Sequence, residues 1–199
     1  MPEPAPGSES AHNSAEQADR VPDLYFRLMS LTIRIRDHFR PPARLLTEFG
    51  IREGMTVVDY GCGPGSYVKG ASGLVGAAGT VYAVDVHELA VKAVSHRSRK
   101  EGLRNVIPVL ANGYDSTLPD AAADLVYALD MFHLVERPEA FLAELRRITK
   151  PDGTLVLDDG HQSREKTRRA LLDSGVWSIE AETGEYLRCR LLSGNTPMR

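Results

Sequence analysis

The chain has 199 residues, 42% of them hydrophobic, which suits one globular domain with a buried core. Its formal net charge of −3 argues against a general attraction to nucleic acid or to anionic membranes. It contains only two cysteines, Cys62 and Cys189, which argues against a disulfide framework and favours a reducing, cytoplasmic compartment.

The N-terminal residues predict neither a secretory signal nor an ordered element. They lack the basic start and apolar core of a signal peptide. Residues 1–20 contain no Val, Ile, Leu or aromatic residue, so we expect a disordered tail. No stretch of the sequence is long and apolar enough to span a membrane.

A helical region is expected next, from Val21 onward. Apolar residues recur there at helical spacing, at Leu24, Leu28, Leu31 and Ile35, until Pro41 and Pro42 end the helix. A second short helix is ended by Gly50. We therefore expect residues 21–50 to form a helical cap before a main domain at residues 51–199. The arginines of this cap are either a solvated face or part of a lid that attracts an acidic substrate.

The most informative segment is V-V-D-Y-G-C-G-P-G at residues 57–65. It predicts a buried strand, a tight glycine turn and a helix N-terminus, which together make a nucleotide-type cofactor site. The spacing G-x-G-x-G differs from the dinucleotide fingerprint G-x-G-x-x-G. Asp59, two residues before the first glycine, suits a positively charged amino group. The alternative is a glycine-rich loop that binds no ligand.

A second carboxylate follows twenty residues later. Residues 79–85 indicate a buried strand that ends in Asp85. A carboxylate at the end of a second strand can accept both hydroxyl protons of a ribose. Asp85 also precedes a helical stretch, so it is alternatively a helix N-cap, and the two roles are compatible.

Strands and helices alternate in the rest of the chain. Helices are expected over residues 87–100, from about Pro138, and over 162–174; strands are expected over 105–110, 124–129 and 154–158, with a turn at Pro151-Asp152-Gly153. The helix from Pro138 should bury Phe141, Leu142, Leu145 and Ile148. The last segment alternates around Thr183-Gly184 and predicts a hairpin. This order implies an α/β fold with a parallel sheet covered on both faces.

Four blocks of the sequence resemble consecutive motifs of the class I S-adenosylmethionine (SAM) methyltransferases. They are VVDYGCGPGSY, VYAVDVH, LPDAAADLVYALDMFHLV and ELRRITKPDGTLVLDD. The similarity covers about residues 54–159 and is nearest to the methyltransferase type 11 and ubiquinone/menaquinone-biosynthesis-like group, which acts mostly on small molecules. It implies a Rossmann-like sandwich with a seven-stranded sheet in the order 3-2-1-4-5-7-6, in which strand seven is antiparallel.

The resemblance also implies the cofactor and the residues that hold it. The cofactor would be SAM, and its product S-adenosylhomocysteine. The implied binding residues are Asp59, Gly61, Cys62, Gly63, Gly65, Asp85, Val86, His87, Asn112, Gly113 and Asp130. The loop after the first strand would hold the methionine tail, Asp85 the ribose, and Val86 and His87 the adenine. Asn112 stands where the family usually has an Asp that touches the adenine amino group.

Methyl transfer from a sulfonium needs mainly alignment, and a weakly acidic acceptor also needs a base. The candidates at the carboxyl ends of the strands are His133, then His161, together with Asp130. Each histidine is alternatively a surface loop residue. We expect no metal ion.

Asp130-Met131-Phe132-His133 differs from the N/D-P-P-Y/F motif of amino methyltransferases, so that chemistry is disfavoured. The prediction is a methyltransferase for a small molecule, without a nucleic acid partner and with a homodimer as an open possibility. The alternatives are a SAM-binding partner subunit without turnover and a nicotinamide-dependent oxidoreductase.

Overall fold

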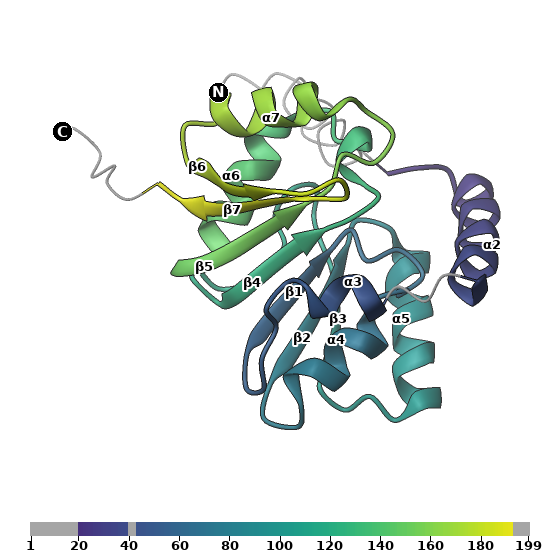
Figure 1. Ribbon diagram of the computed structural model, residues 1–199. Coiled ribbons are helices and arrows are strands. Elements are labelled where there is room, and N and C mark those ends of the chain that lie inside the picture. The colour runs from purple at the N-terminus through teal and green to yellow at the C-terminus, as the bar shows by residue number, and fades with distance from the viewer. Residues whose placement is uncertain (1–19, 40–42, 193–199) are drawn as a thin grey trace, which may run out of the picture.

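The computed structural model describes residues 20–39 and 43–192, which form a seven-stranded sheet covered by helices on both faces (Figure 1). The strand order is β3-β2-β1-β4-β5-β7-β6. Strands β1 to β5 run parallel, and β7 is antiparallel to both of its neighbours. The predicted fold class is therefore confirmed, including the closing hairpin.

The elements follow the predicted alternation along the chain. The helices are α2 (Asp23–Phe39), α3 (Ala43–Thr47), α4 (Val68–Val75), α5 (Glu88–Glu101), η1 (Phe132–Leu134, a single 3₁₀ turn), α6 (Pro138–Ile148) and α7 (Arg164–Asp173). The strands are β1 (Thr56–Tyr60), β2 (Thr80–Asp85), β3 (Val106–Leu110), β4 (Ala123–Ala128), β5 (Thr149–Leu157), β6 (Trp177–Glu182) and β7 (Leu187–Leu191). The short turn η1 was not expected from the sequence.

The core has two halves, one on each face of the sheet. Because successive side chains of a strand point to opposite faces, Val57 and Val58 of β1 enter different halves. One half packs against α6 and α7, and the other against α3, α4 and α5. The predicted buried face of α6 is confirmed: Phe141, Leu142, Leu145 and Ile148 are each at most 1% exposed. Each such side chain contributes about 1.5–3 kcal/mol by leaving water.

The predicted turn at residues 151–153 is wrong as a strand boundary. Strand β5 already begins at Thr149, and the register jumps from Ala123↔Thr149 to Leu125↔Thr154. Residues 150–153 therefore bulge out opposite a single residue, Asp124. The Lys150 ammonium spans this bulge and donates to Asp124 Oδ1 at 2.6 Å. An ion pair between neighbouring strands thus replaces the expected break.

Helix α2 is present, but it faces the other way from what its clearest apolar spacing suggests. Leu24, Leu28, Leu31 and Ile35 are 54–71% exposed. Phe26, on the opposite face, is 5% exposed. The predicted tail lies outside the described residues except for Arg20. No helix in the described part of the chain has the length and apolarity needed to cross a membrane.

Candidate active site

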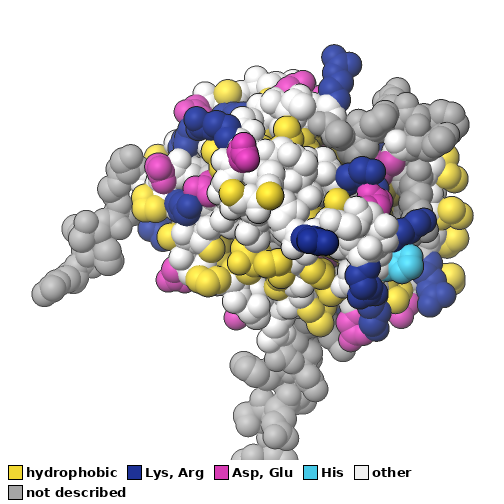
Figure 2. Space-filling model, turned by 90° about the horizontal axis from the view of Figure 1, so that it is seen from below, with side chains coloured by type: hydrophobic (Ala, Val, Ile, Leu, Met, Phe, Trp, Pro, Cys, Tyr) yellow, Lys and Arg dark blue, Asp and Glu magenta, His cyan; other side chains and the backbone are white. Residues whose placement is uncertain are grey.

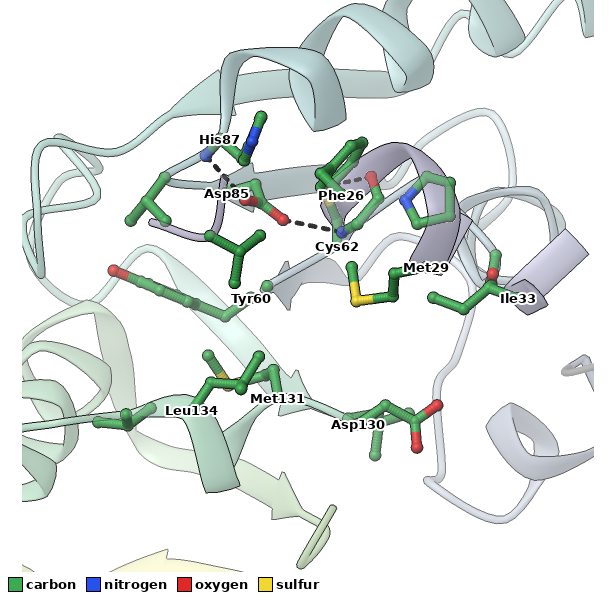
Figure 3. Close-up of a pocket in the computed structure, with 18 of the residues that line it drawn as sticks. Phe26, Met29, Ile33, Tyr60, Cys62, Asp85, His87, Asp130, Met131 and Leu134 are labelled. Atoms are coloured by element: carbon green, nitrogen blue, oxygen red, sulfur yellow. Dashed lines mark hydrogen bonds between the residues drawn. The ribbon is translucent and has the colours of Figure 1, made fainter. Parts of the chain in front are cut away.

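A cavity lies where strands β1, β2 and β4 end, and α2 forms its outer wall. Most of its lining is apolar, including Met29, Ile33, Met131, Leu134 and Phe141. Met131 and Leu134 lie on one side of it, and Asp85 and His87 lie on the other (Figure 3). In open parallel sheets this end of the strands is where ligands bind.

The three predicted glycines follow β1 and have different neighbours. All three have positive φ angles of +76°, +51° and +82° at Gly61, Gly63 and Gly65. A Cβ at Gly61 would lie 2.7 Å from Met131 Cγ, whereas a Cβ at Gly63 would have nothing within 4 Å. Gly61 and Gly63 line the cavity, and Gly65 packs instead against Val94 of α5. The loop therefore leaves open backbone at Gly63 for a ligand.

Asp85 ends β2 beside this loop, and the loop amides bind its carboxylate. Its Oδ2 accepts from the Gly63 amide and its Oδ1 from the His87 amide, both at 2.8 Å. Burial raises its pKa, while these two N–H groups favour the charged form. Asp85 is not the N-cap of α5: that residue is His87, whose Nδ1 accepts from the Leu89 amide. A carboxylate has about four acceptor sites, so Asp85 keeps capacity for a diol.

Val86 and His87 both line the cavity, as the resemblance implied. The His87 ring stacks on Phe26 of α2, with ring centroids 4.3 Å apart and 23° between the planes. His87 Nε2 lies 3.5 Å from Asp23 Oδ1 and makes no hydrogen bond with any residue that the structure describes. These contacts fix α2 against the end of β2 and produce a flat aromatic surface at the cavity.

Asp59 lies beneath the glycine loop and does not line the cavity. Burial raises its pKa to about 8, and its Oδ2 has no hydrogen-bond partner among the described residues. The Tyr127 hydroxyl faces this carboxyl and favours its charged form, but the geometry falls short of a hydrogen bond. A buried carboxyl oxygen without a partner is costly unless a ligand supplies one. Cys62 is buried in the same loop, and burial raises the pKa of its thiol.

The segment after β3 is only partly in the site. Gly113 and Tyr114 line the cavity, and Asn112 does not. The Asn112 backbone instead pairs with Asp115, donating at 2.8 Å and accepting at 3.0 Å. Tyr114 was missed by the sequence analysis, because nothing in the pattern distinguishes it from a packing residue.

Asp130 lines the cavity at the end of β4, in a backbone conformation that side chains rarely adopt. Its φ is +60°, and its N–H donates to both oxygens of Asp158 at 2.9 Å. Burial raises the pKa of Asp158 to about 6. The Asp130 carboxylate forms an ion pair with Arg36 of α2. Such strained residues cluster at functional sites.

The two histidines come together, as expected for neighbouring loops, but outside the lining of the cavity. Their rings meet edge to face with centroids 4.7 Å apart. His133 packs on the Gly160 backbone so closely that a Cβ there would lie 2.1 Å from its Nδ1. Burial, followed by His161, lowers the pKa of His133. Their catalytic role stays a prediction.

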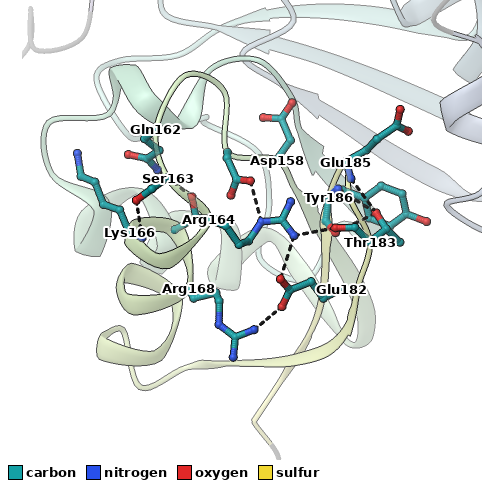
Figure 4. Close-up of polar contacts among 12 residues, drawn as sticks. Asp158, Gln162, Ser163, Arg164, Lys166, Arg168, Glu182, Thr183, Glu185 and Tyr186 are labelled. Carbon is teal, nitrogen blue, oxygen red and sulfur yellow. Dashed lines mark hydrogen bonds and ion pairs between the residues drawn. The ribbon is translucent and has the colours of Figure 1, made fainter.

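The loop that carries Asp158 and His161 is anchored to the C-terminal hairpin. Arg164 donates to Asp159 Oδ2 at 2.7 Å and to the Thr183 carbonyl at 2.8 Å. Arg164 and Arg168 both reach Glu182 (Figure 4). The network holds the loop whose Asp158 carboxylate accepts from the Asp130 N–H.

The sequence analysis expected a helical cap here but did not identify the residues with which α2 lines the cavity. Phe26, Met29, Ile33 and Arg36 all line the cavity. The first three are spaced by three and four residues, a helical pattern opposite to the leucine stripe. That second stripe was the available signal.

Comparisons with known proteins agree with this geometry. Residues 58–157 match the methyltransferase domain family. Nocamycin O-methyltransferase of Saccharothrix syringae is 34% identical over 122 residues, which cover 61% of this chain and 44% of that protein. Demethylmenaquinone methyltransferase of Geobacillus stearothermophilus is 27% identical over 134 residues, which cover 66% and 56%. The chain spans about half the length of the curated relatives it matches.

Among solved structures, a SAM-dependent methyltransferase from Aquifex aeolicus is similar in sequence and in fold. It is 32% identical, with a TM-score of 0.70, over 76% of this chain and 89% of that chain.

Proposed function

The chain belongs to the class I SAM-dependent methyltransferases, and on that premise we propose that it methylates a small, largely apolar acceptor. The observation that carries the proposal is the apolar cavity between α2 and η1, which opens beside the glycine loop and Asp85. Acidic and backbone groups line one end of the cavity, and methionine, leucine, isoleucine and phenylalanine side chains of α2, η1 and α6 line the rest.

The residues present fit SAM. Bound SAM supplies an electrophilic methyl group on a sulfonium sulfur. The unpartnered Oδ2 of Asp59 suits its cationic amino group, directly or through water. Asp85 has acceptor capacity for the ribose hydroxyls, and the stacked rings of His87 and Phe26 offer an apolar surface for the adenine. The open backbone at Gly63 allows close approach.

The apolar lining from α2 and η1 supports a small apolar acceptor. Met29, Ile33, Met131 and Leu134 offer only weak, adaptable apolar contacts. The names of the relatives, which refer to nocamycin and demethylmenaquinone, indicate small molecules. Asp130 is the predicted catalytic residue that lines the cavity, so we assign it the orientation of a polar acceptor group. An acidic hydroxyl would then need little more than alignment and exclusion of water.

A SAM-binding partner subunit without turnover is the second candidate. It is favoured by one observation: neither His133 nor His161 lines the cavity. A protein of this kind would bind the cofactor without methylating any acceptor on its own.

Calorimetric titration with SAM, S-adenosylhomocysteine and NAD tests the cofactor site. We expect both adenosyl ligands to bind, NAD not to bind, and Asp85→Ala to weaken SAM binding about tenfold or more. Asp152→Ala, which removes an exposed carboxylate from the bulge of β5, is the matched control. Binding of NAD alone would contradict the proposal. A screen of phenolic and quinol acceptors that follows S-adenosylhomocysteine release then separates an enzyme from a partner subunit.

A further inference from the structure

The outer face of α2 carries an apolar stripe that nothing described in this chain covers. We define the α2 stripe as Leu24, Leu28, Leu31 and Ile35, spaced by four, three and four residues so that they share one helix face. Each of the four is more than half exposed. Hydrophobic side chains line the edge of the molecule in Figure 2 on the side where α2 lies in Figure 1. A contiguous exposed apolar face commonly marks an interaction site.

The segments that the structure does not describe contain too few apolar side chains to cover the stripe. Residues 1–19 contain no Val, Ile, Leu or aromatic residue, and neither do residues 193–199. Residues 40–42 are Arg-Pro-Pro. The occupant of the stripe must therefore be something other than these segments.

The charge around the stripe indicates what that occupant is. Residues 20–40 contain five arginines and two aspartates, a net charge of +3 in a chain whose total is −3. Both aspartates are engaged: Asp23 pairs with Arg20, and Asp37 with Arg36. By helical periodicity, positions 27 and 34 of the sequence, both arginine and seven residues apart, border the stripe. The occupant is therefore apolar where it meets the stripe and negative at its edge.

A second copy of this chain does not meet that requirement. If two α2 helices packed antiparallel through their stripes, sequence position 27 of one copy would come next to position 34 of the other, and both positions are arginine, so like charges would meet. If they packed parallel, Arg27 would face Thr32, which carries no charge. In neither arrangement do the arginines gain an acidic partner.

We propose that α2 docks on an anionic lipid surface, with its stripe at the boundary between headgroups and acyl chains. An amphipathic helix with leucines on one face and arginines at its border is the usual element for this contact. The net charge of the rest of the protein, which is negative, would orient α2 toward the lipid. The opposite face of α2 contributes Phe26, Met29 and Ile33 to the cavity, so docking would bring the cavity wall to the membrane. The proposal holds whether or not the acceptor proposed above is correct.

Sedimentation with vesicles tests the proposal. One set of vesicles contains equal parts of phosphatidylcholine and phosphatidylglycerol, and the other only phosphatidylcholine. We expect the protein to bind the anionic vesicles, more weakly as salt increases, and Leu28→Ser/Leu31→Ser to reduce binding about tenfold or more. Leu172→Ser/Leu192→Ser removes two equally accessible leucines elsewhere, 58% and 49% exposed, and should bind like the parent. Circular dichroism confirms that both variants are folded.

Three results would overturn the proposal. The first is equal sedimentation of the parent and the stripe variant, and the second is no sedimentation with anionic vesicles. The third is a dimer of the parent in light scattering that dissociates in Leu28→Ser/Leu31→Ser, which would assign the stripe to a second copy. Binding that is lost in Arg27→Glu only for the anionic vesicles would support it further.

Discussion

Replacement of Asp59 by Asn should stabilise the protein without ligand while it weakens SAM binding. The carboxyl is 2% exposed, its Oδ2 has no hydrogen-bond partner in the described part of the chain, and burial raises its pKa from 3.8 to about 8. At pH 7 the folded state therefore keeps the proton, whereas the unfolded chain loses it. The stability that the neutral carboxyl contributes is complete below pH 3.8 and is lost as pH rises through about 8.

The magnitude follows from the two pKa values. A shift of one unit corresponds to about 1.4 kcal/mol, so the parent should lose up to about 4 kcal/mol between pH 5 and pH 8 through Asp59 alone. Asn has the same shape and no charge, and it escapes this loss. In urea unfolding over that pH range, the free energy of unfolding of Asp59→Asn should rise steadily relative to the parent.

Asp124→Asn provides a control of opposite sign. Burial alone would raise the pKa of Asp124, but hydrogen bonds from Lys150 and the Thr56 amide lower it. This stability is present above the ordinary pKa of the carboxyl and is lost as pH falls through the folded-state value. Asp124→Asn should therefore be less stable than the parent near pH 7, and the difference should disappear in acid.

The reasoning would be refuted if the difference in the free energy of unfolding between Asp59→Asn and the parent did not change with pH. In SAM binding, Asp59→Asn should have an unfavourable effect, in contrast to its stabilising effect on the protein without ligand. The cationic amino group of SAM favours the charged carboxylate of Asp59, which Asn lacks. Calorimetry should show SAM affinity falling about tenfold or more in Asp59→Asn, and rising with pH in the parent up to about pH 8 as the carboxyl ionises. Equal affinity of the two proteins would remove Asp59 from the site.

Two further pairs of substitutions test the loop and the catalytic residues. Gly61→Ala places a Cβ 2.7 Å from Met131 Cγ at a φ of +76°, so we expect a loss of about 1–3 kcal/mol in urea unfolding. Gly184→Ala has nothing within 4 Å of its Cβ and should change stability by less than about 0.5 kcal/mol. Once a methyl acceptor has been identified, Asp130→Asn should lower kcat about tenfold or more, and His133→Ala should lower it less than about threefold. The reverse order would identify His133 as the base.

The sheet and its carboxylates could be predicted because local and global signals agree there. Asp59 follows two β-branched residues and Asp85 follows the apolar run V-Y-A-V, and each lies on a buried strand, as expected. A buried parallel strand must be apolar along its length, so a carboxylate near its end is conspicuous. The same logic fails at Pro151-Asp152-Gly153, where turn residues sit in a bulge inside β5.

The orientation of α2 could not be predicted, because the helix has two apolar stripes. Leucines form one, and Phe26, Met29 and Ile33 form the other. Periodicity finds a helix but does not say which stripe meets the domain. Which stripe packs on the domain depends on a tertiary contact, because Phe26 stacks on His87, a residue far away in the sequence.

The orientation of His133, away from the cavity, could not be predicted for a related reason. Residues 129–137 have no periodic pattern that reveals a 3₁₀ turn. In η1 the buried anchor is Phe132, 2% exposed and 5.8 Å from the Phe141 ring. Once Phe132 enters the core, Met131 and Leu134 face the cavity and His133 faces Gly160.

The C-terminal hairpin, which closes this fold, also reaches the site. Thr183 and Glu182 at its turn hold Arg164, which holds Asp159 in the loop after β5. The preceding Asp158 accepts the N–H of Asp130 and helps to keep that residue at its strained φ. A residue in such a conformation persists only when its surroundings fix it. The hairpin is therefore part of what aims the Asp130 carboxylate into the cavity, in addition to completing the sheet.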